Sequence, residues 1–257
     1  MPMSEDIGSL VLAQNGRLVL ALRSGFAWFD PDRAHMSAIV DPEPDTPETR
    51  LNDAKCDNGG RIWCGSMDSE SGVARGRLYR LDVDGTCSPA LGSFLTPNGP
   101  VFSIDERILY LADTRKSVIY AYDHDPATGS LGDQRIFADL GAFPGGPDGA
   151  TLDEEGYLWS AQWDGGCLLR LDPRGAIDRI VTLPVSKPTS CCFGGPDYRQ
   201  LFVTTATRGL SGERLRAEPL AGSVLVLDVA TGGFPPARFG SRHQENVAPP
   251  SVRRSAS

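Results

Sequence analysis

Short apolar stretches separated by turns rich in Gly, Asp and Asn run along most of the 257-residue chain. One phrase is a turn with Gly or Asp followed by a stretch with an aromatic or aliphatic centre, as in NGRLVLAL at residues 15–22. The phrase returns at residues 58–65, 105–113, 155–161 and 198–205. Because the apolar positions lack the 3.6-residue spacing of an amphipathic helix, these stretches predict β-strands.

A second phrase, an apolar stretch that ends in Asp, follows each copy of the first. Its five copies end at Asp30, Asp82, Asp123, Asp172 and Asp228. The linked phrases recur about every 45 residues, and that period with strand and turn content is typical of four-stranded propeller blades. The alternative, a β-sandwich with accidental internal similarity, does not require copies that stay in phase. We therefore predict an all-β chain with about five propeller blades.

The domain organisation follows from where the pattern stops. Residues 1–240 are predicted to form a single β-propeller domain, with turns supplied by many of the 29 Gly and 20 Pro residues. Residues 241–257 are polar, contain Pro and have no period. Such a segment cannot bury enough apolar surface to supply a blade, so it is predicted to be a disordered tail.

Composition excludes several classes of function. The formal net charge of -8 argues against nucleic acid as a partner, since binding to nucleic acid usually needs a basic face. No stretch approaches the ~18 apolar residues of a membrane span, and the first residues lack the basic and apolar regions of a signal peptide. The six Cys form no C-x-x-C pair and are interpreted as reduced thiols, which predicts a cytoplasmic protein. No motif specifies an oligomeric state.

Candidate chemistry lies in three segments where Gly, Pro or charged neighbours surround an oxygen-bearing side chain. PNGP carries Asn98, GPDG carries Asp148, and RLNDAK carries Arg50, Asn52 and Asp53. Each is predicted to be a turn between strands, which directs its polar side chain into open space. Single N-G or D-G pairs are ordinary turn formers. Three such segments in equivalent places of a repeat instead suggest residues that converge on one point.

The same segments resemble the regucalcin/gluconolactonase family, also called the senescence marker protein family. RLNDAKCDNGGRIWCGSM, residues 50–67, resembles the family pattern R-[FL]-N-D-x-x-x-D-x-x-G-R-x-[WF]-x-G-[ST]-M. PNGPVFS, GPDGATLDEEGYLWSA and SKPTSCCFGG resemble three further family motifs and follow in the same order. The resemblance extends over roughly residues 8–240.

This resemblance implies a six-bladed propeller that hydrolyses sugar lactones with a divalent metal in its central channel. By correspondence of motifs, Asn98 and Asp148 are expected to bind the metal, and Arg50, Asn52 and Glu70 to contact the substrate. Oxygen ligands suit Ca²⁺ or Mg²⁺, with Mn²⁺ and Zn²⁺ also possible. Asp148 is further expected to act as general base. Asp53 is expected to be structural, bonding backbone amides near its own position.

The chain departs from the family pattern at its start. The third metal ligand of the family is a Glu in an E-[SG]-P-x-W motif, which is missing here, and Glu5 lies too close to the first strand to replace it. The chain begins about where the second family blade begins. Either the first blade is missing, as expected for a truncated member, or the start of the chain has been assigned too late. Two hypotheses stay open: an active lactonase, or a catalytically impaired propeller that binds calcium or sugar-like ligands without turnover.

Overall fold

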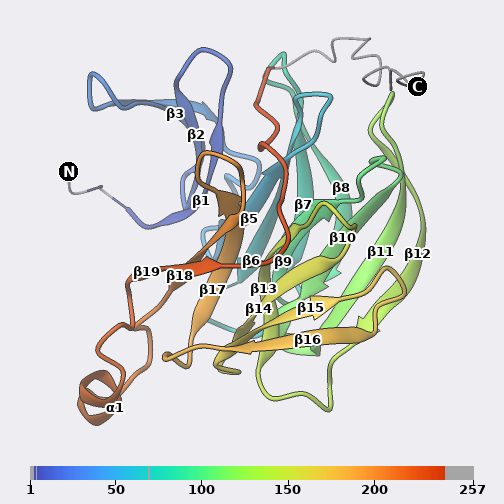
Figure 1. Cartoon of the computed structure of the whole chain (residues 1–257). Coiled ribbons are helices and arrows are strands. Elements are labelled where there is room, and N and C mark those ends of the chain that lie inside the picture. Colours follow the sequence, from blue (N-terminus) through green and yellow to red (C-terminus); the bar gives the residue numbers. More distant parts are fainter. Residues whose placement is uncertain (1–2, 4, 69, 241–257) are drawn as a thin grey trace, which may run out of the picture.

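Five antiparallel β-sheets follow one another along the chain (Figure 1). A computed structural model of the protein describes residues 3, 5–68 and 70–240. The expected tail, residues 241–257, lies outside the described residues. The prediction of an all-β propeller with about five blades is confirmed. No helix within the described part of the chain is long and apolar enough to cross a membrane.

The first four sheets have four strands and the fifth has three. Their bounds are β1 (Ile7–Leu12), β2 (Leu18–Leu22), β3 (Gly25–Asp30) and β4 (His35–Val40); β5 (Thr49–Cys56), β6 (Ile62–Asp68), β7 (Gly76–Leu81) and β8 (Cys87–Phe94); β9 (Pro97–Phe102), β10 (Ile108–Asp113), β11 (Val118–Asp125) and β12 (Ser130–Asp139); β13 (Gly146–Leu152), β14 (Leu158–Trp163), β15 (Cys167–Leu171) and β16 (Ile177–Thr182); β17 (Pro188–Gly194), β18 (Gln200–Thr205) and β19 (Val224–Asp228). Two short helices, η1 (Thr114–Lys116) and α1 (Gly212–Ala217), occupy connections.

The two repeated sequence phrases correspond to the second and third strands of every sheet. The first phrase ends in β2, β6, β10, β14 and β18, and the second forms β3, β7, β11, β15 and β19. The strand that precedes them, β1, β5, β9, β13 or β17, is the inner strand, because consecutive inner strands contact one another. Since strands alternate in direction, the turns after β2, β6, β10, β14 and β18 lie at the end where inner strands begin. We call this the site end and the opposite one the far end.

Apolar side chains fill the space between consecutive sheets. Trp63, Leu78, Leu109 and Leu111 form one such cluster between the second and third sheets, and none of these side chains is exposed to solvent. Trp159 and Leu201 are central to the cluster between the fourth and fifth sheets. Burial of this apolar surface is the main force that holds one sheet against the next. All six Cys are free thiols, as expected.

The first and last sheets are joined by a segment rather than by their inner strands. Among the described residues, no contact comparable to those between the other inner strands links β17 with β1. Residues 229–240, here called the strap, instead cross the far end of the molecule (Figure 1). Glu154 N donates to Gly232 O at 2.8 Å, and Phe239 N donates to Leu12 O at 2.9 Å. Phe239 also packs against Trp28, with 5.5 Å between ring centroids.

Buried Asp–Trp pairs lock two of the far-end turns. Asp57 accepts hydrogen bonds from Trp63 Nε1 at 2.9 Å and from Arg61 Nε at 2.7 Å, and its side chain is fully buried. Asp153 accepts equivalent bonds from Trp159 Nε1 at 2.9 Å and from Arg170 Nε at 2.8 Å. A buried carboxylate is tolerated only when it is paired and hydrogen-bonded, as both are.

In the third sheet the Asp and the Trp of this unit are replaced together. In the third sheet, the position equivalent to Asp153 is Ser103 and the one equivalent to Trp159 is Leu109. The acidic residue is thus replaced where the indole N–H donor is replaced. The turn motif D-x-x-G-x-x-W therefore describes a structural unit at the far end, away from the inner-strand starts.

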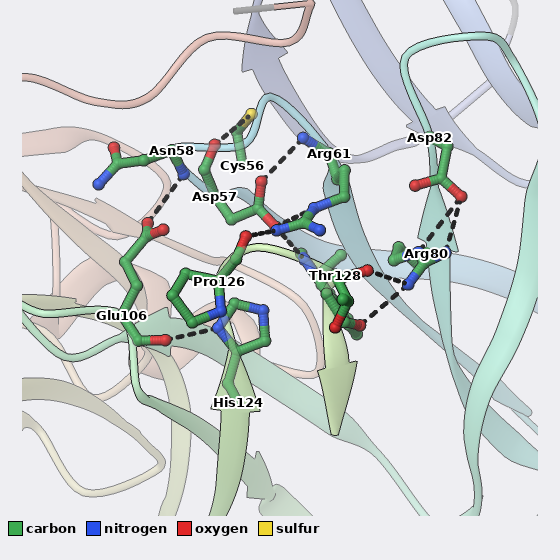
Figure 2. A network of polar contacts seen from close by, with 12 residues as sticks. Cys56, Asp57, Asn58, Arg61, Arg80, Asp82, Glu106, His124, Pro126 and Thr128 are labelled. Carbon is green, nitrogen blue, oxygen red and sulfur yellow. Dashed lines mark hydrogen bonds and ion pairs between the residues drawn. The ribbon is translucent and has the colours of Figure 1, made fainter. Parts of the chain in front are cut away.

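A polar network ties the far ends of the second and third sheets together (Figure 2). Glu106 accepts a hydrogen bond from Asn58 N at 2.8 Å, and Arg61 donates to Pro126 O at 2.7 Å. His124 contacts Glu106 O through Nδ1 at 2.5 Å and packs edge-on against the Trp63 ring. Because a carbonyl only accepts, Nδ1 carries the proton and Nε2 is deprotonated.

Protonation of His124 is expected to destabilise the fold. His124 is buried, its Nε2 has no hydrogen-bond partner within the described residues, and burial lowers its pKa below 6.5. As pH falls below about 6.5, the unfolded chain binds the proton before the folded chain does, so folding free energy is lost through this window. As the pH is lowered from 6.5, the melting temperature of the wild type should therefore decrease more steeply than that of a His124→Phe variant. Parallel pH profiles of the two proteins would contradict this assignment.

Candidate active site

Every inner strand carries a bulge near its start, at the site end. The register of the inner strand against the second strand shifts between positions 7 and 9, 51 and 54, 98 and 101, 147 and 150, and 188 and 190. The residues left unpaired are Gly8, Asn52 with Asp53, Gly99 with Pro100, Asp148 with Gly149, and Thr189. Bulges redirect side chains and often lie beside active sites.

Four of the predicted site residues lie in strands, which corrects the expectation that they lie in turns. Arg50 and Asn52 belong to β5, Asn98 to β9 and Asp148 to β13. In β9 the Gly and Pro neighbours that suggested a turn form the bulge, in β13 Gly149 forms it with Asp148, and in β5 Asn52 and Asp53 form it themselves. A bulge needs the same permissive backbone as a tight turn: Gly99, for example, has a φ of 53°.

Arg50, Asn52 and Asn98 form one hydrogen-bonded row across two inner strands. Arg50 Nη1 donates to Asn52 Oδ1 at 2.9 Å, and Asn52 Nδ2 donates to Asn98 Oδ1 at 2.5 Å. Asn52 and Asn98 are buried, and Arg50 is partly buried. The amide oxygen of Asn98 therefore lies next to the guanidinium-bound amide of Asn52, near the site-end start of β9.

Asp148 lies on the next inner strand, beside Asn98. A methyl group at Gly99 would stand 2.7 Å from Asp148 O, so the two bulges approach as closely as only glycine allows. Burial raises the pKa of Asp148 well above its usual range, and the nearby charge of Asp53 raises it further. The Arg50 charge and a hydrogen bond from Gly149 N act in the opposite direction.

Asp53 behaves as a structural residue, as the sequence predicts. It accepts hydrogen bonds from Ala54 N and Gly99 N, both at 2.9 Å, and from Ser9 Oγ at 3.3 Å. These bonds join three inner strands. Asp53 therefore holds the bulge that follows Asn98 in place.

Arg50 is a partly desolvated cation with like-charged neighbours. Its pKa is lowered first by burial and then by the charges of Arg208 and Arg23. The described residues place no carboxylate within ion-pair distance of its guanidinium, which instead donates to Leu51 O and Asn52 Oδ1. The guanidinium of Arg50 would be stabilised by a hydrogen bond to any anionic or carbonyl oxygen that reached it.

Two acidic residues considered from the sequence lie apart from this row. Glu70 is exposed in the connection after β6, where its backbone N donates to Asp68 Oδ1 at 2.9 Å. The same connection passes Arg115 at the site end, since a methyl group at Gly72 would lie 3.0 Å from Arg115 Nη1. Glu5 accepts bonds from Ser24 N at 3.0 Å and Ser24 Oγ at 2.7 Å. Its carboxylate is therefore engaged with the turn after β2.

Sequence reasoning missed Thr114, which lies in η1 at the site end. Thr114 Oγ1 contacts Asn98 Nδ2 at 2.8 Å and Pro147 O at 2.7 Å, and so connects the Asn98 bulge with the residue before Asp148. It follows Asp113 in the segment ADTRK, which carries no motif on its own. Only its position just after a second strand, at the end where the inner strands begin, could have indicated it.

The donor chemistry of these residues suits a hard cation. An amide oxygen and a carboxylate stand on neighbouring strands, and the carboxylate is desolvated without an ion-pair partner among the described residues. The described residues contain no group of three or more His, Cys, Asp or Glu side chains able to hold a metal. Any cation here would depend on the amide oxygen of Asn98 as well as on Asp148.

Comparison with known proteins agrees with this fold. Residues 1–207 match the family model described as "SMP-30/Gluconolactonase/LRE-like region". The chain therefore belongs to the SMP-30/gluconolactonase family, as its motifs predict.

Individual relatives cover most of the chain. It is 37% identical over 242 residues to pentonolactonase XacC of Haloferax volcanii. The matched region covers 92% of this chain and 81% of that protein. The chain is 36% identical to regucalcin of Danio rerio, over 90% of this chain and 79% of the relative. The crystal structure of a calcium-binding protein, regucalcin, from Agrobacterium tumefaciens superposes with a TM-score of 0.89 at 25% identity, over 93% of this chain and 81% of that one.

Proposed function

We propose that the protein hydrolyses sugar lactones with the help of a divalent metal ion. The observation that carries the proposal is the row from Arg50 through Asn52 to Asn98, placed beside the desolvated carboxylate of Asp148. Family membership and the similarity to a pentonolactonase support the choice of lactones as the substrate class. The similarity to a calcium-binding regucalcin supports the use of a cation.

Asn98 and Asp148 would hold the cation, and Ca²⁺, Mg²⁺, Mn²⁺ and Zn²⁺ are all candidates. When bound, the cation would polarise the lactone carbonyl and stabilise the negative charge that develops on its oxygen. The fit rests on Asn98 Oδ1, which has two lone pairs and spends one on Asn52 Nδ2. It rests equally on Asp148, because burial raises the pKa of its carboxyl and no ion-pair partner of that carboxylate lies among the described residues, so a cation would supply the counter-charge.

The side chains divide the remaining work. Asp148 accepts a proton from water as the water oxygen adds to the carbonyl carbon. The ring C–O bond then breaks, the ring oxygen gains a proton, and the product is the open hydroxy acid. Arg50 donates in a forked geometry to lactone oxygens, and Asn52 donates to a hydroxyl or the carbonyl. Glu70, on a connection at the site end, accepts a hydrogen bond from a sugar hydroxyl.

The direct test is acid release from glucono-δ-lactone and from a pentonolactone at near-neutral pH. Each of the four metals is added in turn, and the assay is repeated with a chelator. We expect turnover that requires metal and disappears with chelator. Metal binding in calorimetry without turnover on either lactone would favour the alternative, a propeller that binds calcium or sugar-like ligands without catalysis. If the protein showed no metal binding and no turnover, the proposal would be overturned.

A further inference from the structure

Thr114 stands where two inner strands of the site come together. Its hydroxyl contacts Asn98 Nδ2 at 2.8 Å and Pro147 O at 2.7 Å. Its backbone N donates to Thr96 O at 3.0 Å. The preceding residue, the fully buried Asp113, accepts bonds from Thr96 N at 2.9 Å and from Leu95 N at 3.1 Å. Thr114 is thus anchored to the connection that leads into β9.

The direction of each hydrogen bond in this part of the site is fixed by its two ends. Pro147 O can only accept, so Thr114 must donate its single hydroxyl proton to it. The Thr114 oxygen can then only accept, so Asn98 must present its NH₂ group to it. At the other end, the Arg50 guanidinium can only donate, so it must meet Asn52 Oδ1.

These two constraints leave one orientation for the Asn98 amide. With Asn52 Oδ1 taken by Arg50, Asn52 offers its NH₂ group, which donates to Asn98 Oδ1 and to Pro97 O. A flipped Asn98 would set its NH₂ against the NH₂ of Asn52. It would also set its oxygen against a Thr114 hydroxyl whose proton is already used. Both bonds of the buried amide would be lost, which is unfavourable in a desolvated site.

We propose that Thr114 is a positioning residue that keeps the oxygen of Asn98, and not its nitrogen, turned toward the cation position. This inference rests on the proposed function, because only a cation requires that oxygen. An Asn amide has an acceptor end and a donor end of nearly equal shape, and the donor end repels a cation. The hydroxyl of Thr114 removes this ambiguity before any metal binds. Thr114 also contacts the backbone just before Asp148, so it spaces the two ligands.

The test compares Thr114→Val, which keeps the shape and removes the hydroxyl, with Thr114→Ser, which keeps the hydroxyl. Calorimetric titration of Ca²⁺ or Mn²⁺ without substrate should show about tenfold weaker binding for Thr114→Val, the scale of one lost buried hydrogen bond, and near wild-type binding for Thr114→Ser. Thr96→Val is the matched control. Thr96 is buried in the adjacent connection, and its hydroxyl has no partner within the described residues.

The outcomes separate this inference from the proposed function. Equal metal affinity of Thr114→Val and wild type, with wild type binding well, would overturn the role of Thr114 alone. An equal loss in Thr96→Val would show a general packing effect and overturn it as well. Absence of metal binding by wild type would overturn the proposed function. The amide orientation is then decided by neutron diffraction, where deuterons on the Asn98 atom facing Asn52 would contradict the inference.

Discussion

Replacing Asp148 with Asn is expected to abolish lactone hydrolysis with little change in fold. The side chain keeps its shape but loses its charge, so it can neither accept a proton from water nor neutralise a cation. Loss of a general base alone lowers turnover ~10²–10⁴-fold, and a weakened cation site adds to that loss. The half-buried carboxylate has no ion-pair partner among the described residues, so its neutral replacement should leave the melting temperature unchanged or raised. The measurement is kcat/KM under saturating metal, with the melting temperature recorded in parallel.

Asp105→Asn provides the matched control for this experiment. Asp105 is an exposed far-end residue that accepts bonds from Ser103 Oγ and Arg107 N, and it lies away from the inner-strand starts. The Asp105→Asn variant should hydrolyse the lactone with the same kcat/KM as the wild-type protein. Asp148→Asn retaining more than a tenth of wild-type kcat/KM would exclude Asp148 as the base. Loss of activity together with a collapsed melting temperature would show instead that Asp148 supports the fold.

The largest expected loss of stability comes from removing the buried carboxylates at the far end. In Asp153→Ala, the indole N–H of Trp159 and one face of Arg170 lose their shared acceptor, and Tyr157 N loses its bond as well. Removing one partner of a buried, hydrogen-bonded charge pair costs about 3–5 kcal/mol of unfolding free energy. Asp57→Ala should have a similar effect, because Trp63 Nε1 and Arg61 Nε lose their shared acceptor. Urea unfolding of the two variants and the wild type measures both losses of unfolding free energy.

Ser103→Ala tests whether the effect belongs to the charge pair or to the turn. Ser103 occupies the equivalent position in the third sheet, where its hydroxyl bonds Asp105 and Ile108 N. Loss of these neutral or exposed bonds should cost about 1 kcal/mol. If Asp153→Ala cost no more than Ser103→Ala, the Asp–Trp pair would not be a principal stabilising unit of its sheet.

The sequence predicted the repeat well because the repeat is local. Each second and third strand is a short apolar stretch between turn residues, and both phrases coincide with strands in all five sheets. The bulges were harder to predict from the sequence. PNGP and GPDG have turn composition, and only pairing with the second strand shows that Asn98 and Asp148 belong to β9 and β13.

The site was predictable as far as its members lie in family motifs. Arg50 and Asn52 were chosen from one segment and Asn98 from another, and the structure joins the three in one row. Thr114 was not predictable, because its hydroxyl contacts Asn98, 16 residues away in the same sheet, and Pro147, 33 residues away in the next sheet, and neither contact leaves a local pattern. Directional hydrogen bonds between distant segments are a property of the folded geometry, which no spacing along the chain encodes.

The strap has a consequence for the order in which the molecule folds. Each sheet pairs strands that are neighbours in sequence and packs mainly on the next sheet, so the sheets can form one after another from local contacts. The strap is different, since Arg238 contacts Ala13 across a separation of 225 residues. Ordering a loop of that size carries a large entropic cost that only the finished array of sheets can offset. Docking of the strap should therefore come last in folding, and its release should be the first opening detected by hydrogen exchange.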